Sequence, residues 1–301
     1  MSEMTIWITL AALAQLITAF TILVDKYVLV SRFYAGKPIV YTFYVSVLSG
    51  FVVVLLPFGV VSWPTREVAG LSLHVAAAFI AGLYFLYAAL KKGHASDAIP
   101  VVGATTAITT SLLALFFLEQ DLPLAFVPAF ALFVVGTFLI SHFHLSIREL
   151  SLVGFAGVLF GASAVLMKLI FLQASFIDGF FWSRAAIVVG ALLLLLWPPN
   201  REAVFHSVRR SRASTKLLII GNKTLAGVAS VLTLLAISLG SVSIVNAMTG
   251  LQFAFLLLFA YLGAHWLPAV FKGEIHRHHF PHKLYGTICI MLGIIALFVV
   301  Q

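Results

Sequence analysis

The stretch LKKGHASDAIPVVG at residues 90–103 has a counterpart in ISLGSVSIVNAMTG at residues 237–250. The alignment brings Gly103 onto Gly250, and apolar and small residues match along most of its length. Internal similarity between two distant parts of a chain is the sequence signature of a structural unit that occurs twice. The pair therefore predicts a fold built from two related halves.

A second pair of similar stretches lies further upstream. VYTFYVSVLSGFVVVLLPF at 40–58 aligns with FFWSRAAIVVGALLLLLWP at 180–198 and brings Gly50 onto Gly190. Each of these runs is long and apolar enough to cross a bilayer. The repeated unit is therefore expected to lie within the membrane.

The composition agrees with a membrane protein that has short loops. Of the 301 residues, 62% are hydrophobic and only 9% are charged, and the mean hydropathy is +1.12. A soluble protein with so little charge could not cover its surface with polar groups. Only Glu3 precedes the first apolar run, so this run is interpreted as a retained span rather than a signal peptide. The single cysteine, Cys289, excludes an internal disulfide and a cysteine-rich metal site.

The pattern predicts an all-α membrane protein of ten transmembrane helices. The first five are expected near 5–25, 39–60, 71–91, 98–119 and 123–142. The second five are expected near 150–172, 179–198, 216–238, 242–264 and 283–300, with basic loops near 199–215 and 265–282. The two repeats then occupy residues 1–145 and 146–301. Because five is odd, the second repeat enters the membrane from the opposite face, and the two form an inverted pair.

The charged loops favour one orientation. Most lysine and arginine residues follow the odd-numbered spans, whereas Arg66 and Lys168 lie on the other side. Since basic loops remain in the cytoplasm, both termini are predicted to face outward. A short-looped chain of this kind suits a prokaryotic inner membrane. The net charge of +8 indicates topology here and not a nucleic-acid partner.

The chain resembles the drug/metabolite transporter superfamily in its ten-span form with two EamA-like repeats. Lys26 and Lys168, which close the first span of each repeat, carry this resemblance, together with the stretch at 86–120 and its partner at 233–266. His265 and Trp266 stand where the family pattern has a glutamate. Members are commonly drawn with cytoplasmic termini, in contrast to the charge pattern here. The resemblance implies transport by alternating access between the repeats.

Polar side chains within spans are the candidates for a substrate site, because they are costly in lipid. Arg184 in particular would favour a carboxylate or phosphate. Helix packing, backbone hydrogen bonding and snorkelling towards the interface are the competing explanations. The substrate-binding candidates are Gln15, Thr18, Tyr44, Tyr84, Tyr87, Thr105, Thr109, Trp182, Arg184, Asn222, Asn246, Thr249 and Gln252. The gating candidates are Lys26, Glu119 and Lys168.

Two other charged groups receive structural interpretations. Asp25, which follows the first apolar run, is expected to form an interfacial ion pair with its neighbour Lys26. The histidines in HRHHFPH at 276–282 are the only candidate metal ligands, and a basic loop at an anionic leaflet explains them better. No nucleotide-binding loop, catalytic triad or HExxH motif occurs, so neither an enzyme nor a bound cofactor is predicted.

The leading hypothesis is a secondary transporter of a small polar or amphipathic metabolite, such as an organic anion or a zwitterion. It would work with the bilayer and its substrate as partners, and a proton or another ion is the candidate for coupling. The first alternative is a flippase for a lipid-linked or amphipathic molecule. The second alternative is a passive channel or a metal-sensing membrane protein.

Overall fold

The computed structural model describes residues 3–30, 37–93, 95–118, 126–141, 145–210, 213–266 and 280–299. These residues are almost entirely helical, and the described ranges contain no strand. Eight helical segments in them are long and apolar enough to cross a membrane. The chain is therefore an all-α integral membrane protein.

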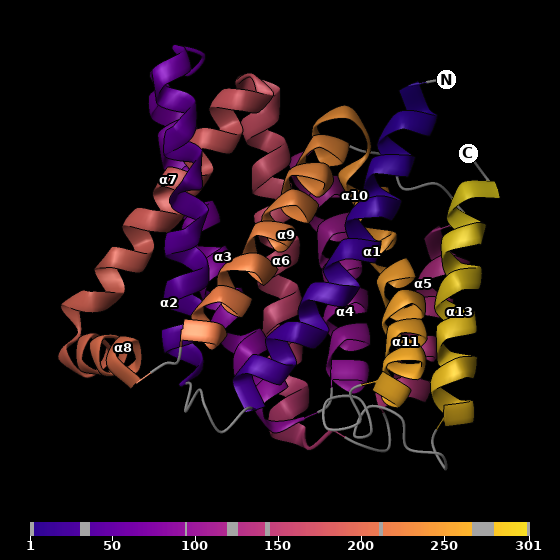
Figure 1. Cartoon of the computed structure of the whole chain (residues 1–301). Helices are drawn as coiled ribbons and strands as arrows, with labels where there is room; N and C mark the ends of the chain where they lie inside the picture. The colour runs from indigo at the N-terminus through magenta and orange to yellow at the C-terminus, as the bar shows by residue number, and fades with distance from the viewer. Residues whose placement is uncertain are drawn as a thin grey trace.

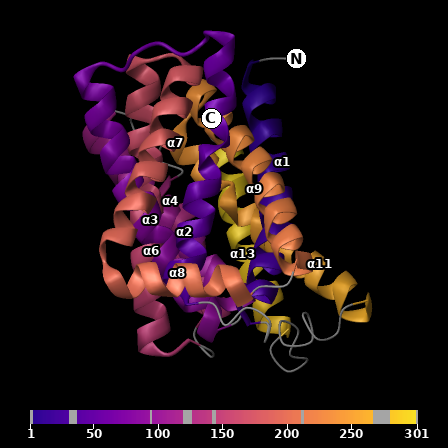
Figure 2. The ribbon, with the colours of Figure 1, turned by 60° about the vertical axis from the view of Figure 1, so that its left-hand side comes forward.

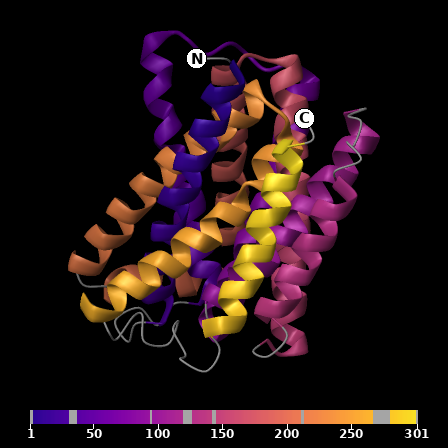
Figure 3. The same ribbon diagram turned by 90° about the vertical axis from the view of Figure 1, so that its right-hand side faces the viewer.

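The helices stand side by side in one bundle, with both chain ends at the same end of it (Figures 1 and 3). In chain order they are α1 (Glu3–Val30), α2 (Pro38–Leu48) continuing as the 3₁₀ segment η1 (Ser49–Phe58), α3 (Arg66–Lys92), α4 (Ala95–Phe117), α5 (Phe126–Ser141), α6 (Ile147–Gln173), α7 (Phe176–Leu193) continuing as η2 (Leu194–Leu196), α8 (Pro198–Arg210), α9 (Ala213–Leu239), α10 (Val242–Ala247), α11 (Thr249–Trp266) and α13 (Phe280–Val299).

Several helix starts follow from local sequence chemistry. The Thr65 hydroxyl accepts a hydrogen bond from the Val68 amide at the start of α3. Ser146 and Glu149 form a reciprocal capping box at the start of α6. These side chains satisfy backbone donors that have no partner within the first turn, so they fix where the helices begin.

The expected spans at 123–142 and 283–300 are not among the eight membrane-spanning segments of the described residues. Within the first range the structure describes α5, with 16 residues. In the region of the second it describes α13, with 20 residues. The expected span at 242–264 is divided into α10 and α11 at Met248, although together they are still long enough to cross.

The expected loop at 199–215 is largely helical. Helix α8 lies across one end of the bundle (Figure 2). Two prolines open it, and Val204 on its inner face is buried against the bundle. The Tyr44 hydroxyl on α2 donates to the Val204 carbonyl at 3.1 Å. A short polar segment with one buried face can thus form a helix on the bundle surface.

Contacts between glycine and threonine hold α4 against α6. A Cβ atom at Gly157 would lie 2.6 Å from the Thr105 Cβ, and one at Gly161 would lie 2.8 Å from the Thr109 Cβ. The Thr106 hydroxyl donates to the Gly157 carbonyl at 3.2 Å. Lipid gives helices no hydrophobic reason to associate, so close approach of this kind supplies the packing energy. Elsewhere α3 packs along α6 and α7, α9 along α1, and α5 along α13.

This packing predicts different effects for two glycines of α6. In Gly161→Leu the new side chain would meet the Thr106 carbonyl oxygen, 2.9 Å from the added Cβ, so the helices must separate. We expect the free energy of unfolding to fall by about 2 kcal/mol or more. Gly154→Leu is the matched control, because nothing lies within 4 Å of its Cβ. Thermal unfolding of both variants in detergent tests this, and equal melting temperatures would contradict it.

Candidate functional site

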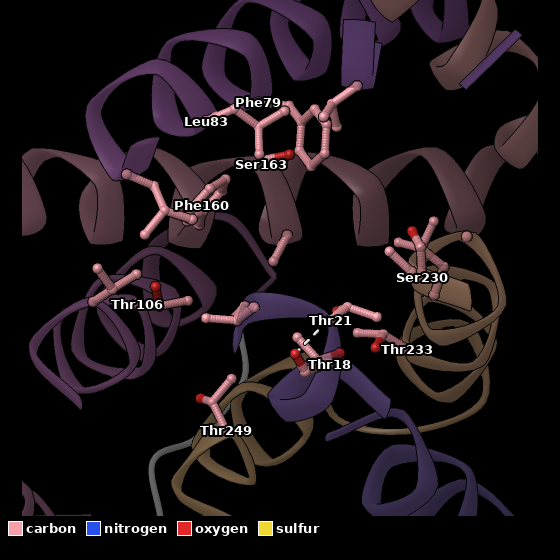
Figure 4. Close-up of a pocket in the computed structure, with 18 of the residues that line it drawn as sticks. Thr18, Thr21, Phe79, Leu83, Thr106, Phe160, Ser163, Ser230, Thr233 and Thr249 are labelled. Carbon is pink, nitrogen blue, oxygen red and sulfur yellow. Dashed lines mark hydrogen bonds between the residues drawn. The ribbon is translucent and has the colours of Figure 1, made fainter. Parts of the chain in front are cut away.

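A cavity of about 370 Å³ lies inside the bundle. Residues of α1, α2, α3, α4, α6, α7, α9, α10 and α11 and of η1 line it. Figure 4 shows hydroxyl groups of Thr18, Thr21, Ser230 and Thr249 around it, with Phe79 and Phe160 on another side. A mostly apolar cavity of this size with a few polar groups suits a small organic molecule.

The structure brings seven of the predicted residues to this cavity. They are Gln15, Thr18, Tyr87, Arg184, Asn246, Thr249 and Gln252. They come from α1, α3, α7, α10 and α11, which are far apart in the sequence. The Asn246 amide also donates to the Thr110 hydroxyl at 2.9 Å. This side chain therefore both lines the cavity and joins α10 to α4.

The other predicted residues lie elsewhere. Thr105 and Thr109 face α6 at the helix contact described above. Tyr84 is 39% exposed on the outer surface. The Trp182 indole donates to the Ser62 carbonyl at 2.9 Å and its ring stacks on Trp63, which is typical of aromatic residues at a membrane interface. Tyr44 binds α8, and Asn222 is buried behind the cavity wall.

Arg184 is the one cation of the wall that the structure leaves without a carboxylate among the described residues. Its side chain is 7% exposed. Nη2 donates to the Ser230 hydroxyl at 2.8 Å, and buried Nε has no partner among the described residues. The guanidinium lies 5.5 Å from the Phe79 ring centroid and 5.3 Å from that of Phe180. Aromatic faces stabilise a cation only in part, so an anion would still be favoured here.

A second charged cluster closes the cavity at the end where α1 finishes, and the sequence did not predict it. The Asp25 carboxylate contacts the Lys223 ammonium at 2.5 Å rather than neighbouring Lys26. It also accepts from the Tyr41 hydroxyl at 2.6 Å and from the Asn222 amide at 2.6 Å. The Tyr87 hydroxyl lies 3.4 Å away. Four helices therefore meet at one buried carboxylate.

The charges of the cavity do not cancel. Asp25, Lys223 and Arg184 are the charged residues that line it. Asp25 and Lys223 neutralise each other at contact distance. Arg184 therefore leaves one net positive charge in a low-dielectric site.

The sequence did not lead us to several hydroxyl residues of the cavity wall, although the spacing of residues on one helix face could have identified some of them. Lys223 and Ser230 are seven residues apart on α9, which places them on one face. Thr106 lines the cavity in place of its predicted neighbour Thr105. The missed hydroxyls are Ser49, Thr106, Ser163, Ser230 and Thr233.

The two predicted gating lysines bind the ends of helices. Lys26 Nζ donates to the carbonyl oxygens of Leu90, at 2.6 Å, and Gly93. Lys168 Nζ donates to three carbonyl oxygens at the end of α9, at 2.9, 3.2 and 2.9 Å. A cation is favoured at a helix C-terminus, where carbonyl groups lack partners. The third gating candidate, Glu119, and the histidines at 276, 278 and 279 lie outside the described residues.

Comparisons with known proteins support the fold alone. No family model matches the chain, and no curated protein matches it. A solved structure described as "Crystal structure of protein" superposes with a TM-score of 0.64. The two are 16% identical over 97% of this chain and 99% of the other. At that identity, the match shows a shared arrangement of helices over nearly the full length.

Because Asp25 and Lys223 form a buried ion pair, we expect the stability losses of their single substitutions not to add up in the double variant. Lys223→Ala leaves the Asp25 carboxylate buried without a cation, and we expect the free energy of unfolding to fall by about 3–5 kcal/mol. In the double variant Asp25→Ala, Lys223→Ala neither charge remains, so most of that loss should be recovered. Thermal unfolding in detergent measures both effects. Additive losses, or a single variant as stable as the wild type, would refute the pairing.

Proposed function

We propose that the chain is a secondary-active transporter that moves a small amphipathic organic anion or zwitterion by alternating access between two inverted repeats, residues 1–145 and 146–301. The observation that carries the proposal is Arg184, a buried cation in the cavity wall without a carboxylate among the described residues. A substrate carboxylate or phosphate would satisfy its free donor and neutralise its charge. Intramembrane ionisable groups of this kind mark substrate pathways.

Support for two inverted repeats comes from the paired lysines. Lys26 and Lys168 hold matched positions in the two aligned halves, and each binds the carbonyl end of the helix that leads into one of the aligned stretches 90–103 and 237–250. Equivalent helices also pack across the two halves. Helix α3 of the first half lies along α6 of the second, and α9 of the second half lies along α1 of the first. An inverted pair with crossed contacts can exchange two related packings, which is the basis of alternating access.

The two sides of the bundle are packed differently, as such a mechanism requires. Helix α3 packs directly along α7. On the other side, α9 and the α2–η1 segment both line the cavity. Exchange of these two arrangements would close the cavity on one side and open it on the other. The charge bias supports an inner-membrane orientation with both termini outside.

A flippase is the second candidate, and one observation favours it. Phe51 of η1 lines the cavity and is also 53% exposed on the surface of the bundle. An amphipathic substrate that remains partly in lipid would require a connection of this kind. The resemblance to EamA-like transporters fits both candidates.

The substrate role of Arg184 predicts a ligand effect that one substitution removes. Purified protein would be heated with a panel of organic anions, amino acids, amines and phosphates. A ligand that binds only the folded state raises the melting temperature in a saturable manner. For an anionic hit, Arg184→Gln should weaken binding by about tenfold or more, since it removes a charge-assisted hydrogen bond.

Arg66→Gln is the matched control, because Arg66 is exposed at the start of α3 and outside the cavity. Uptake of the same compound into proteoliposomes then tests transport. An anion that binds Arg184→Gln as tightly as the wild type would remove Arg184 from the site. A panel without any hit would overturn the polar-metabolite form of the proposal.

A further inference from the structure

The cavity reaches the outer surface of the bundle between η1 and α9. Phe51 stands on one side of this gap and is both cavity-lining and half-exposed. Ala226 and Gly227 stand on the other side and carry almost no side chain. A Cβ atom built on Gly227 would lie 3.8 Å from the Phe51 ring. This distance is van der Waals contact, so the Phe51 ring itself closes the gap against a strip of α9 that carries almost no side chain.

The depth of this gap decides what lies outside it. Phe51 is near the middle of the membrane-spanning segment Pro38–Phe58, and Gly227 is near the middle of Leu217–Leu239. The exposed surface at the midpoint of a span meets acyl chains rather than water. The Phe51 ring therefore stands between the cavity and the hydrocarbon of the bilayer.

An apolar path leads from Arg184 to the gap. The Phe180 ring lies 5.3 Å from the guanidinium on one side and 6.1 Å from the Phe51 ring on the other. A ligand whose anionic group binds Arg184 would have aromatic rings beside its adjoining carbons. Those carbons would extend towards lipid at no cost in hydration.

The same cavity offers no free carboxylate to a positively charged group. Asp25 is the acidic residue of the wall, and it already accepts from Lys223, Asn222, Tyr41 and Tyr87. A substrate ammonium would have to displace one of these donors. A zwitterion would therefore lose hydration without an ionic partner.

We infer that the substrate is an amphipathic monoanion, bound by Arg184 at its acidic group, whose apolar chain passes between η1 and α9 into the bilayer when the Phe51 ring turns aside. The inference rests on the proposed transport function and names the class of molecule that this site would take. It makes Phe51 and Gly227 the boundary of the lateral opening.

Photo-crosslinking tests the path directly. The protein in lipid nanodiscs would be exposed to decanoate that carries a diazirine near the end of its chain, and the labelled peptides would be mapped by mass spectrometry. Labels should concentrate on the segment around Phe51 and on α9 near Gly227, and Arg184→Gln should reduce them about tenfold. Labels spread evenly over the lipid-facing surface, or unaffected by Arg184→Gln, would overturn the inference.

A matched pair of glycine variants tests the opening. Gly227→Phe places a ring opposite Phe51, whereas Gly221→Phe adds a ring to α9 where nothing lies within 4 Å of the new Cβ. We expect Gly227→Phe to weaken decanoate binding by about fifteenfold, which corresponds to losing the contacts of about two methylenes at about fourfold each. Gly221→Phe should bind as the wild type does, and equal binding by both variants would refute the opening.

Charge and chain length separate this inference from the proposed function. Decanoate should bind at least about tenfold more tightly than 2-aminodecanoate, and equal affinities would refute the preference for a monoanion. Acetate or benzoate bound through Arg184 in the absence of decanoate binding would overturn the lateral path and leave the transport proposal standing. Failure of every anion to bind would overturn both.

Discussion

The arrangement of the cavity depends on how buried charge is compensated in a low-dielectric environment. An isolated carboxylate inside a membrane protein is costly, so Asp25 draws in donors from every helix around it. Lys223 and Asn222 come from α9, Tyr41 from α2 and Tyr87 from α3. Their shared acceptor fixes the separation of these helices at one end of the cavity. Arg184 on α7 has no such set of partners among the described residues, and the proposed function assigns substrate binding to this charge.

Small residues and hydroxyl groups shape the rest of the bundle. Gly157 and Gly161 let α4 and α6 approach until threonine side chains touch backbone. On α9 the small residues Ala226 and Gly227 line the cavity, and the Phe51 ring of η1 lies beside Gly227. The same residue type therefore brings two helices together in one place and borders the cavity in another.

The apolar pattern predicted the class of fold, and it did so because span length follows from bilayer thickness. It also singled out Arg184, since an arginine within an apolar run has few ordinary explanations. The pairing of Asp25 with Lys26 was wrong, because adjacent residues of a helix point about 100° apart and do not face each other. The true partner, Lys223, is distant in sequence and could be found only from the packing of α1 on α9. The rotation of α4 about its axis likewise depends on packing. It turns Thr105, which was expected at the cavity, towards α6, whereas Thr106 lines the cavity and also binds the Gly157 carbonyl.

The contacts of Lys26 and Lys168 have a consequence for how such a chain can change over evolutionary time. Both lysines bind main-chain oxygen atoms, which every amino acid supplies. The residues at 90 and 237 can thus be replaced without loss of the acceptor, whereas the ammonium group has no equivalent in an apolar side chain. Selection for this contact would act on the lysine, whereas the side chains at 90 and 237 would be constrained only by their packing in the core. Distant relatives would then share two lysines at matched positions while the residues that receive them differ, and correlated substitution between the partners would be absent.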